Sequence, residues 1–199
     1  MRETRAMAKP FVELFLGGSE RGLPRTAQIA WVVGASLFVA CCARVSLPLP
    51  FTPVPLTLAN FGVLLVGLIL GARAGFAALV LYLIEGVIGL PVFSPTGPGG
   101  LSQLVGPTGG FLLAYPFAAA VAGGIAESGR RTLGRTTAAA VLAEIVLFAG
   151  GISWLAVLSH SFSQAVHFGL YWFVFAEVIK IMLAAALAHR GQRVVRIRK

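Results

Sequence analysis

The distribution of basic residues among apolar runs constrains this chain more than any other feature. Six apolar runs can be traced, at about 27–43, 56–70, 74–90, 109–126, 137–158 and 165–189. Arg and Lys precede the first run, follow the last and occur in every second connection, whereas the connections 46–55, 91–107 and 159–165 contain neither. Loops of membrane proteins that are rich in Lys and Arg stay in the cytoplasm. The pattern therefore predicts an all-α membrane protein with six transmembrane helices and both termini cytoplasmic.

The composition agrees with a membrane location and excludes several soluble functions. The chain is 57% hydrophobic, and its acidic residues are seven Glu with no Asp. It also has no Gly-Lys-Ser/Thr phosphate-binding loop, so it lacks the groups with which ATPases hold Mg²⁺ and phosphate. The net charge of +9 resides in the connections, which favours membrane orientation over nucleic-acid binding. We expect no metal site or cofactor, because the Cys and His residues lack ligand spacing.

We expect one domain with two cytoplasmic extensions. Residues 1–26 form an N-terminal cytoplasmic segment, 27–189 a six-helix substrate-binding membrane domain, and 190–199 a basic cytoplasmic tail. Small residues recur at every fourth position of the fourth run, where they would let a neighbouring helix approach closely. These residues are Gly110, Ala114, Ala118, Ala122 and Ala126.

A Gly- and Pro-rich stretch separates the third and fourth helices. Within it, the prolines between Pro91 and Pro107 remove backbone donors and clash with a preceding helical turn, so no regular helix is expected there. The stretch is also uncharged and keeps several apolar residues. Irregular backbone at membrane depth is tolerated only where protein covers it or a cavity requires it. We interpret the stretch as a cap or re-entrant loop over a ligand site.

Five charged residues lie inside the apolar runs, where each costs about 2.5–3.5 kcal/mol at the helix centre. Helix direction and rise place Arg44 and Glu85 together in the outer layer, and Glu144 near the level of Lys180. For Glu85 and Glu144, structural pairs with Arg44 and Lys180 are at least as good an interpretation as a function.

Glu177 and Lys180 are three residues apart and share one face of the sixth helix. They could form an ion pair that only supports packing. Alternatively, Lys180 meets an anion and Glu177 accepts hydrogen bonds from amide-like N–H groups of a ligand. We favour the second interpretation, because charges inside the membrane mark functional sites by default.

Three runs resemble the BioY family: PVPLTL at 53–58, LYLIEGVIGLPVF at 81–93 and LVGPTGGFL at 104–112. BioY proteins are the biotin-specific S components of energy-coupling factor (ECF) transporters, and the resemblance spans about 27–187. It implies a subunit without enzymatic activity that captures biotin at the bacterial plasma membrane. It also implies, as partners, a membrane-embedded T subunit that carries two ATPase subunits, and the lipid bilayer itself.

The sixth helix departs from the family pattern. BioY proteins usually carry Gly-x-x-Pro-Phe-x-Pro-Gly-Asp-x-x-Lys, which here reads GLYWFVFAEVIK from Gly169 to Lys180. Trp172 and Phe175 stand where the prolines would be, which predicts an unbroken start to the helix, and Glu177 replaces the Asp. A BioY-like subunit for a different small vitamin-like ligand is therefore the alternative.

The chemistry of biotin guides the choice of site residues. Its carboxylate, ureido group and apolar rings require a cation, a carboxylate or amide acceptor, and apolar walls. Glycines of the cap can bring backbone groups close to a ligand. The predicted ligand-binding residues are Lys180, Glu177, Gly99, Gly100, Thr108, Gly109, Gly110, Asn60 and the wall residues Tyr82, Tyr115 and Trp172.

Two further expectations concern other surfaces. Ala30 and Gly34 on the first helix are predicted to contact the T subunit, because small residues permit close helix crossing; packing within this chain is the alternative. An intramembrane enzyme would use Ser153 or Glu144 on a lipid or peptide. A lone Gly-x-Ser, with His160 seven residues on, is a weak signal without an orienting partner. A transport subunit is favoured over an enzyme.

Overall fold

The computed structural model describes residues 24–129 and 132–197, with side chains as far as residue 190. The predicted N-terminal segment 1–26 thus lies almost entirely outside the described residues. The helices are α2 (Arg25–Arg44), α3 (Ala59–Leu70), α4 (Ala72–Val87), α5 (Gly100–Val105), α6 (Gly109–Glu127), α7 (Leu133–Ser159), α8 (Phe162–Val166), the π-helical turn η2 (His167–Tyr171) and α9 (Val174–Ile197). The strands β1 (Ser46–Leu47) and β2 (Leu56–Thr57) pair antiparallel.

The helical class expected from the sequence is confirmed, and each predicted apolar run contains one long helix. Within the described residues, α2, α6 and α7 are long and apolar enough to cross a membrane, and the bent pair α8–α9 qualifies if it counts as one span. Helices α3 and α4 are shorter, with 12 and 16 residues. The number of membrane crossings stays a prediction.

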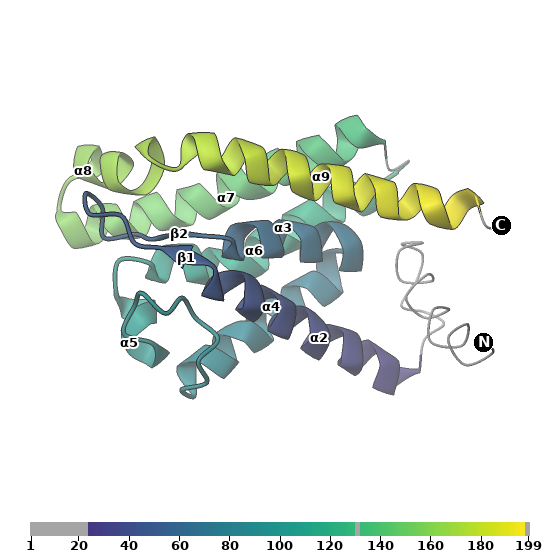
Figure 1. Ribbon diagram of the computed structural model, residues 1–199, viewed down its shortest axis with the longest axis horizontal. Helices are drawn as coiled ribbons and strands as arrows, with labels where there is room; N and C mark the ends of the chain where they lie inside the picture. Colours follow the sequence, from purple (N-terminus) through teal and green to yellow (C-terminus); the bar gives the residue numbers. More distant parts are fainter. Residues whose placement is uncertain (1–23, 130–131, 198–199) are drawn as a thin grey trace.

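The connections gather at two ends of the bundle (Figure 1). The start of α2, the α3–α4 turn, the start of α7 and the end of α9 lie at one end, and β1–β2, α5 and α8 lie at the other. The first end carries the basic residues Arg73 and Arg135, in accord with the alternation along the sequence. Which end faces the cytoplasm remains a prediction.

Small residues bring the helix backbones together, as the row on α6 predicts. All five members of that row are buried. A Cβ at Gly110 would collide with Trp154 and the Gly150 carbonyl of α7, and one at Gly67 of α3 would lie 2.5 Å from the Ala119 carbonyl oxygen of α6. Close backbone contact of this kind is the usual basis of helix association in lipid.

The cap between α4 and α6 contains one short helix, which the prediction of a wholly irregular segment missed. Helix α5 lies between Pro98 and Pro107, in a stretch that is free of proline. The cap is anchored by the side chain of Phe93, which is 3% exposed and packs edge-on against Tyr82 at a ring distance of 5.3 Å. A Cβ at Gly86 would collide with the Phe93 ring, so glycine makes room for this anchor.

The predicted unbroken start of the sixth helix is wrong. The chain runs through α8 and η2 and then bends by 49° into α9. The Thr52 hydroxyl, in the β1–β2 connection, donates to the Phe168 carbonyl at 2.7 Å. A side chain that binds a carbonyl of the helical ladder is a recognised cause of kinks and π-turns. The break therefore forms without the family's prolines.

Candidate ligand-binding site

A cavity of about 40 Å³ lies beneath the cap, between α3, α4, α6 and α9. On this measure a water molecule needs about 10–15 Å³, so the cavity has room for a few waters. Its walls combine aromatic rings with a set of polar side chains. The polar members are Thr57, Asn60, Tyr82, Ser94, Gln103, Thr108, Tyr115 and Glu177.

Asn60 is the centre of the polar network in this cavity. It lies in the first turn of α3, immediately after β2, and the hairpin thus delivers its side chain to the middle of the bundle. Its Nδ2 donates to Glu177 Oε1 at 3.2 Å and to Glu144 Oε1 at 3.5 Å. Its Oδ1 accepts from the Tyr115 hydroxyl at 3.0 Å. One amide thereby joins α3, α6, α7 and α9.

Glu177 and Lys180 form a buried ion pair, with Nζ and Oε1 2.7 Å apart and side chains that are 4% and 7% exposed. Glu177 lines the cavity, whereas Lys180 lies behind it. The second carboxylate oxygen of Glu177 has no hydrogen-bond partner among the described residues. The arrangement leaves one oxygen of Glu177 without a partner, and Lys180 contacts the same side chain from outside the cavity lining.

The structural pairs suggested for the other two glutamates do not form within the described chain. Arg44 donates to the Pro91 carbonyl at 3.4 Å, and Glu85 instead accepts from the Ser36 hydroxyl at 3.0 Å. Glu144 is bound by Asn60, while Lys180 is taken by Glu177. Helix rise gives an expected depth for each of these groups, whereas the rotation of each helix decides which of them meet.

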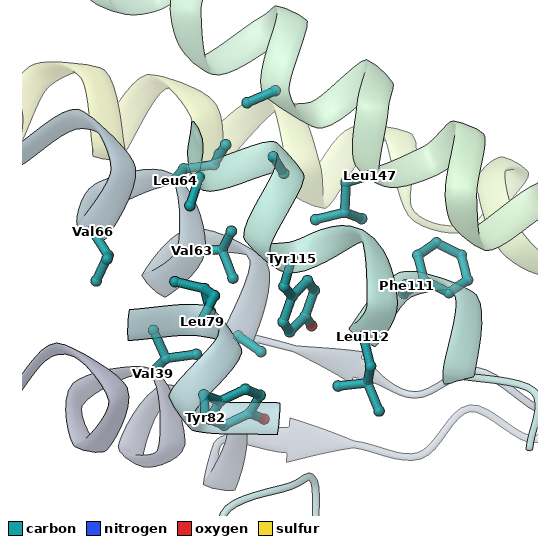
Figure 2. Packing of buried hydrophobic residues seen from close by; sticks show 14 of the residues in the cluster. Val39, Val63, Leu64, Val66, Leu79, Tyr82, Phe111, Leu112, Tyr115 and Leu147 are labelled. Atoms are coloured by element: carbon teal, nitrogen blue, oxygen red, sulfur yellow. The ribbon is translucent and has the colours of Figure 1, made fainter. Parts of the chain in front are cut away.

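Tyr82 and Tyr115, the two tyrosines predicted to line the ligand site, lie in the packed core (Figure 2). Tyr82 projects from α4 and Tyr115 from α6, and their ring centroids are 6.2 Å apart. The Tyr82 side chain is fully buried, and its hydroxyl has no hydrogen-bond partner in the described part of the chain. The cavity wall therefore contains a free hydroxyl donor as well as the free acceptor of Glu177.

The other predicted site residues fall into two groups. Thr108 lines the cavity and donates to the Gln103 carbonyl at 3.4 Å. The rest lie off the cavity lining. Gly99 and Gly100 open α5 with positive φ, and Gly109 and Gly110 pack against Leu104 and Trp154. Trp172 is 39% exposed and packs at a tilt against Phe51, with ring centroids 4.1 Å apart.

Three polar residues of the cavity lining were not identified from the sequence: Thr57, Ser94 and Gln103. Gln103 is 3% exposed and accepts from the Gly99 N–H, and Ser94 lies within hydrogen-bond distance of Ser46 and Thr96, at 2.7 and 2.8 Å. The sequence does contain a pattern that could have identified them. They are polar residues in uncharged, proline-rich segments, and protein is expected to cover such segments at membrane depth.

Comparison with known proteins identifies the family. A model of the BioY family matches residues 12–197. A protein from Pyrococcus horikoshii named "Probable biotin transporter BioY" is 35% identical over 79% of this chain and 93% of its own length. Proteins named "Biotin transporter BioY" from Rhizobium etli and Thermotoga maritima are 37% and 35% identical, over 77% and 80% of this chain and 86% and 94% of their own lengths.

A solved structure supports the fold independently. It is described as the S-component for biotin from an ECF-type ABC transporter, and it superposes with a TM-score of 0.76 over 85% of this chain and 92% of that chain. The sequence identity is 23%, so this match concerns the fold alone. Taken with the family model and the relatives, the comparison shows that the chain belongs to the BioY family.

Proposed function

We propose that this chain is the membrane subunit that captures biotin for uptake, with transport powered by separate T and ATPase subunits. The observation that carries the proposal is the pair of free polar groups on the cavity wall, the acceptor Glu177 Oε2 and the donor hydroxyl of Tyr82. A ureido group offers N–H donors and a carbonyl acceptor, so it satisfies both. Buried polar groups without a hydrogen-bond partner cost free energy, so a ligand that pairs with both groups is favoured to bind.

The remaining walls suit the rest of the ligand. Phe111, Phe148 and Phe173 supply apolar surface for the fused rings. The carboxylate end would then lie toward the cap, where the hydroxyls of Ser94 and Thr108, which are hydrogen-bonded within the cap region, would turn to donate to it. Sites for such ligands usually enclose about 300 Å³ or more, which exceeds the cavity under the cap. Capture therefore requires the cap to move outward and close again over the ligand.

Binding measurements on purified protein in lipid nanodiscs test this assignment. Calorimetric titration with biotin should give one site per chain, and Tyr82→Phe should weaken it by about threefold to tenfold through loss of one hydrogen bond. Trp172→Phe, at a residue off the cavity, serves as the matched control. Saturable binding of another vitamin in place of biotin would favour the alternative ligand that the change from Asp to Glu177 suggests.

The partner surface proposed for the T subunit is on α2. Ala30 and Gly34 are exposed, and a Cβ at Gly34 would meet nothing within 4 Å. Their exposure favours contact with a partner over packing inside this chain. Replacing both with Leu should abolish co-purification with the T subunit and leave biotin binding intact. Loss of folding and binding together would instead show that these residues pack internally.

An enzymatic function has less support. Ser153 lies in an outer groove between α6 and α7, and His160 is the left-handed C-cap residue at the end of α7. No hydrogen bond links the two side chains within the described residues. Nucleophilic catalysis requires the base within hydrogen-bond reach of the nucleophile, so a transport role remains the better account.

A further inference from the structure

Two carboxyl groups from different helices meet beside the cavity. Glu144 of α7 and Glu177 of α9 are 4% and 3% exposed, and both accept from the Asn60 amide. One amide nitrogen thus contacts an oxygen of each group, which places the two carboxyl groups side by side. Two ionised carboxylates in one buried site repel each other, and neither can donate a hydrogen bond to the other. The arrangement therefore calls for a proton on one of the two groups.

The charge balance of the cluster leads to the same requirement. Lys180 is the cation bound to Glu177, Asn60 is neutral, and Tyr115 reaches the cluster through Asn60. With both carboxyl groups ionised, the site would hold a net negative charge in a region with little water. One added proton makes it neutral. Buried charges are tolerated when they are paired, and uncompensated ones are strongly unfavourable.

The geometry also indicates which carboxyl group holds the proton. Glu177 is 2.7 Å from the Lys180 ammonium, a charge-assisted contact that favours its ionised form. Glu144 has a longer contact of 3.5 Å to Asn60. As ionised groups, Glu144 and Glu177 would each keep one buried oxygen without a donor. A proton on Glu144 supplies that donor, and the Glu177 carboxylate, with about four lone-pair sites, keeps acceptor capacity for a ligand.

We propose that Glu144 is a proton-carrying positioning residue, which donates its O–H to Glu177 and thereby holds the Glu177 carboxylate ionised and fixed at the cavity wall. The role in ligand binding rests on the function proposed above, whereas the protonation of Glu144 does not. Glu144 itself is not part of the cavity lining, so it acts on the ligand only through Glu177.

Infrared spectroscopy of the wild-type protein in nanodiscs at neutral pH tests the proton directly. The protonated-carboxyl C=O absorption should decrease in Glu144→Gln. Glu85→Gln is the control, because Glu85 is buried elsewhere and contacts a serine hydroxyl; it should leave the Glu144 component in place. The proposal is overturned if Glu144→Gln retains the full wild-type absorption.

Biotin titration of position 144 tests the positioning role. Glu144→Ala should weaken binding by about tenfold, because Glu177 loses a donor. Glu144→Gln keeps an N–H donor and should restore most of the affinity, whereas Glu144→Leu, of similar size, should not. Equal affinity of folded Gln and Leu variants would overturn the positioning role. If the wild-type protein bound no biotin, the function proposed above would fail while the infrared result would stand on its own.

Discussion

Replacing Lys180 with Met tests whether the buried ion pair supports binding. Methionine keeps the apolar stem and removes the ammonium, which lies 2.7 Å from Glu177 Oε1. The stranded Glu177 must then take a proton or turn away, and either change removes the ionised acceptor from the cavity wall. Truncating one partner of a buried charge pair typically costs about 2–5 kcal/mol in binding. Since Lys180 acts through Glu177, we expect the lower end of this range, which still corresponds to at least about tenfold.

Calorimetric titration of purified protein with biotin measures this effect. Thermal unfolding in the same lipid should confirm that the Lys180→Met protein is folded. Arg73→Met, which removes an exposed cation at the opposite end of the bundle, is the matched control and should bind biotin like the wild type. If folded Lys180→Met also binds biotin as tightly as the wild type, the pair serves packing alone and the ligand site lies elsewhere.

Three other outcomes follow from the same structure. Glu177→Ala should weaken biotin binding at least tenfold in the same titration, since it removes the free acceptor; unchanged affinity would contradict the cavity assignment. In intact cells, on a background without Cys41 and Cys42, Gly99→Cys should react with an impermeant thiol reagent and Ser128→Cys should not; the reverse result would invert the topology. Gly67→Ala should lower the unfolding temperature, because its Cβ would lie 2.5 Å from a backbone carbonyl of α6, whereas Gly34→Ala should not. Equal stability of these two variants would argue against the close α3–α6 crossing.

The helices were largely predictable because the apolar runs end at charges, prolines and glycines. The run expected at 109–126 matches α6 to within one residue. The main departures come from tertiary contacts. Residues 56 and 57 join a strand rather than α3, and the bend before α9 depends on Thr52, more than a hundred residues away in the sequence. Local secondary-structure propensity does not indicate a hydrogen bond between residues so far apart in the sequence.

The lining of the candidate cavity was predictable at its charged residue and less so at its neutral ones. An intramembrane Glu or Lys is conspicuous in a sequence, and Glu177 does line the cavity. Single amides and hydroxyls are ordinary by comparison, so Gln103 and Ser94 were missed. The pairing of Glu144 with Asn60 rather than Lys180 depends on helix rotation, which residue spacing alone does not determine.

The most direct test of the central claim is to identify the small molecule that the native protein holds. The chain should be purified gently from membranes of cells supplied with biotin, then denatured, and the released compounds quantified by mass spectrometry. We predict about one biotin per chain for the wild type and a large decrease for Glu177→Ala. A different stoichiometric vitamin, or equal amounts of biotin from the wild type and Glu177→Ala, would contradict the assignment of this cavity to biotin.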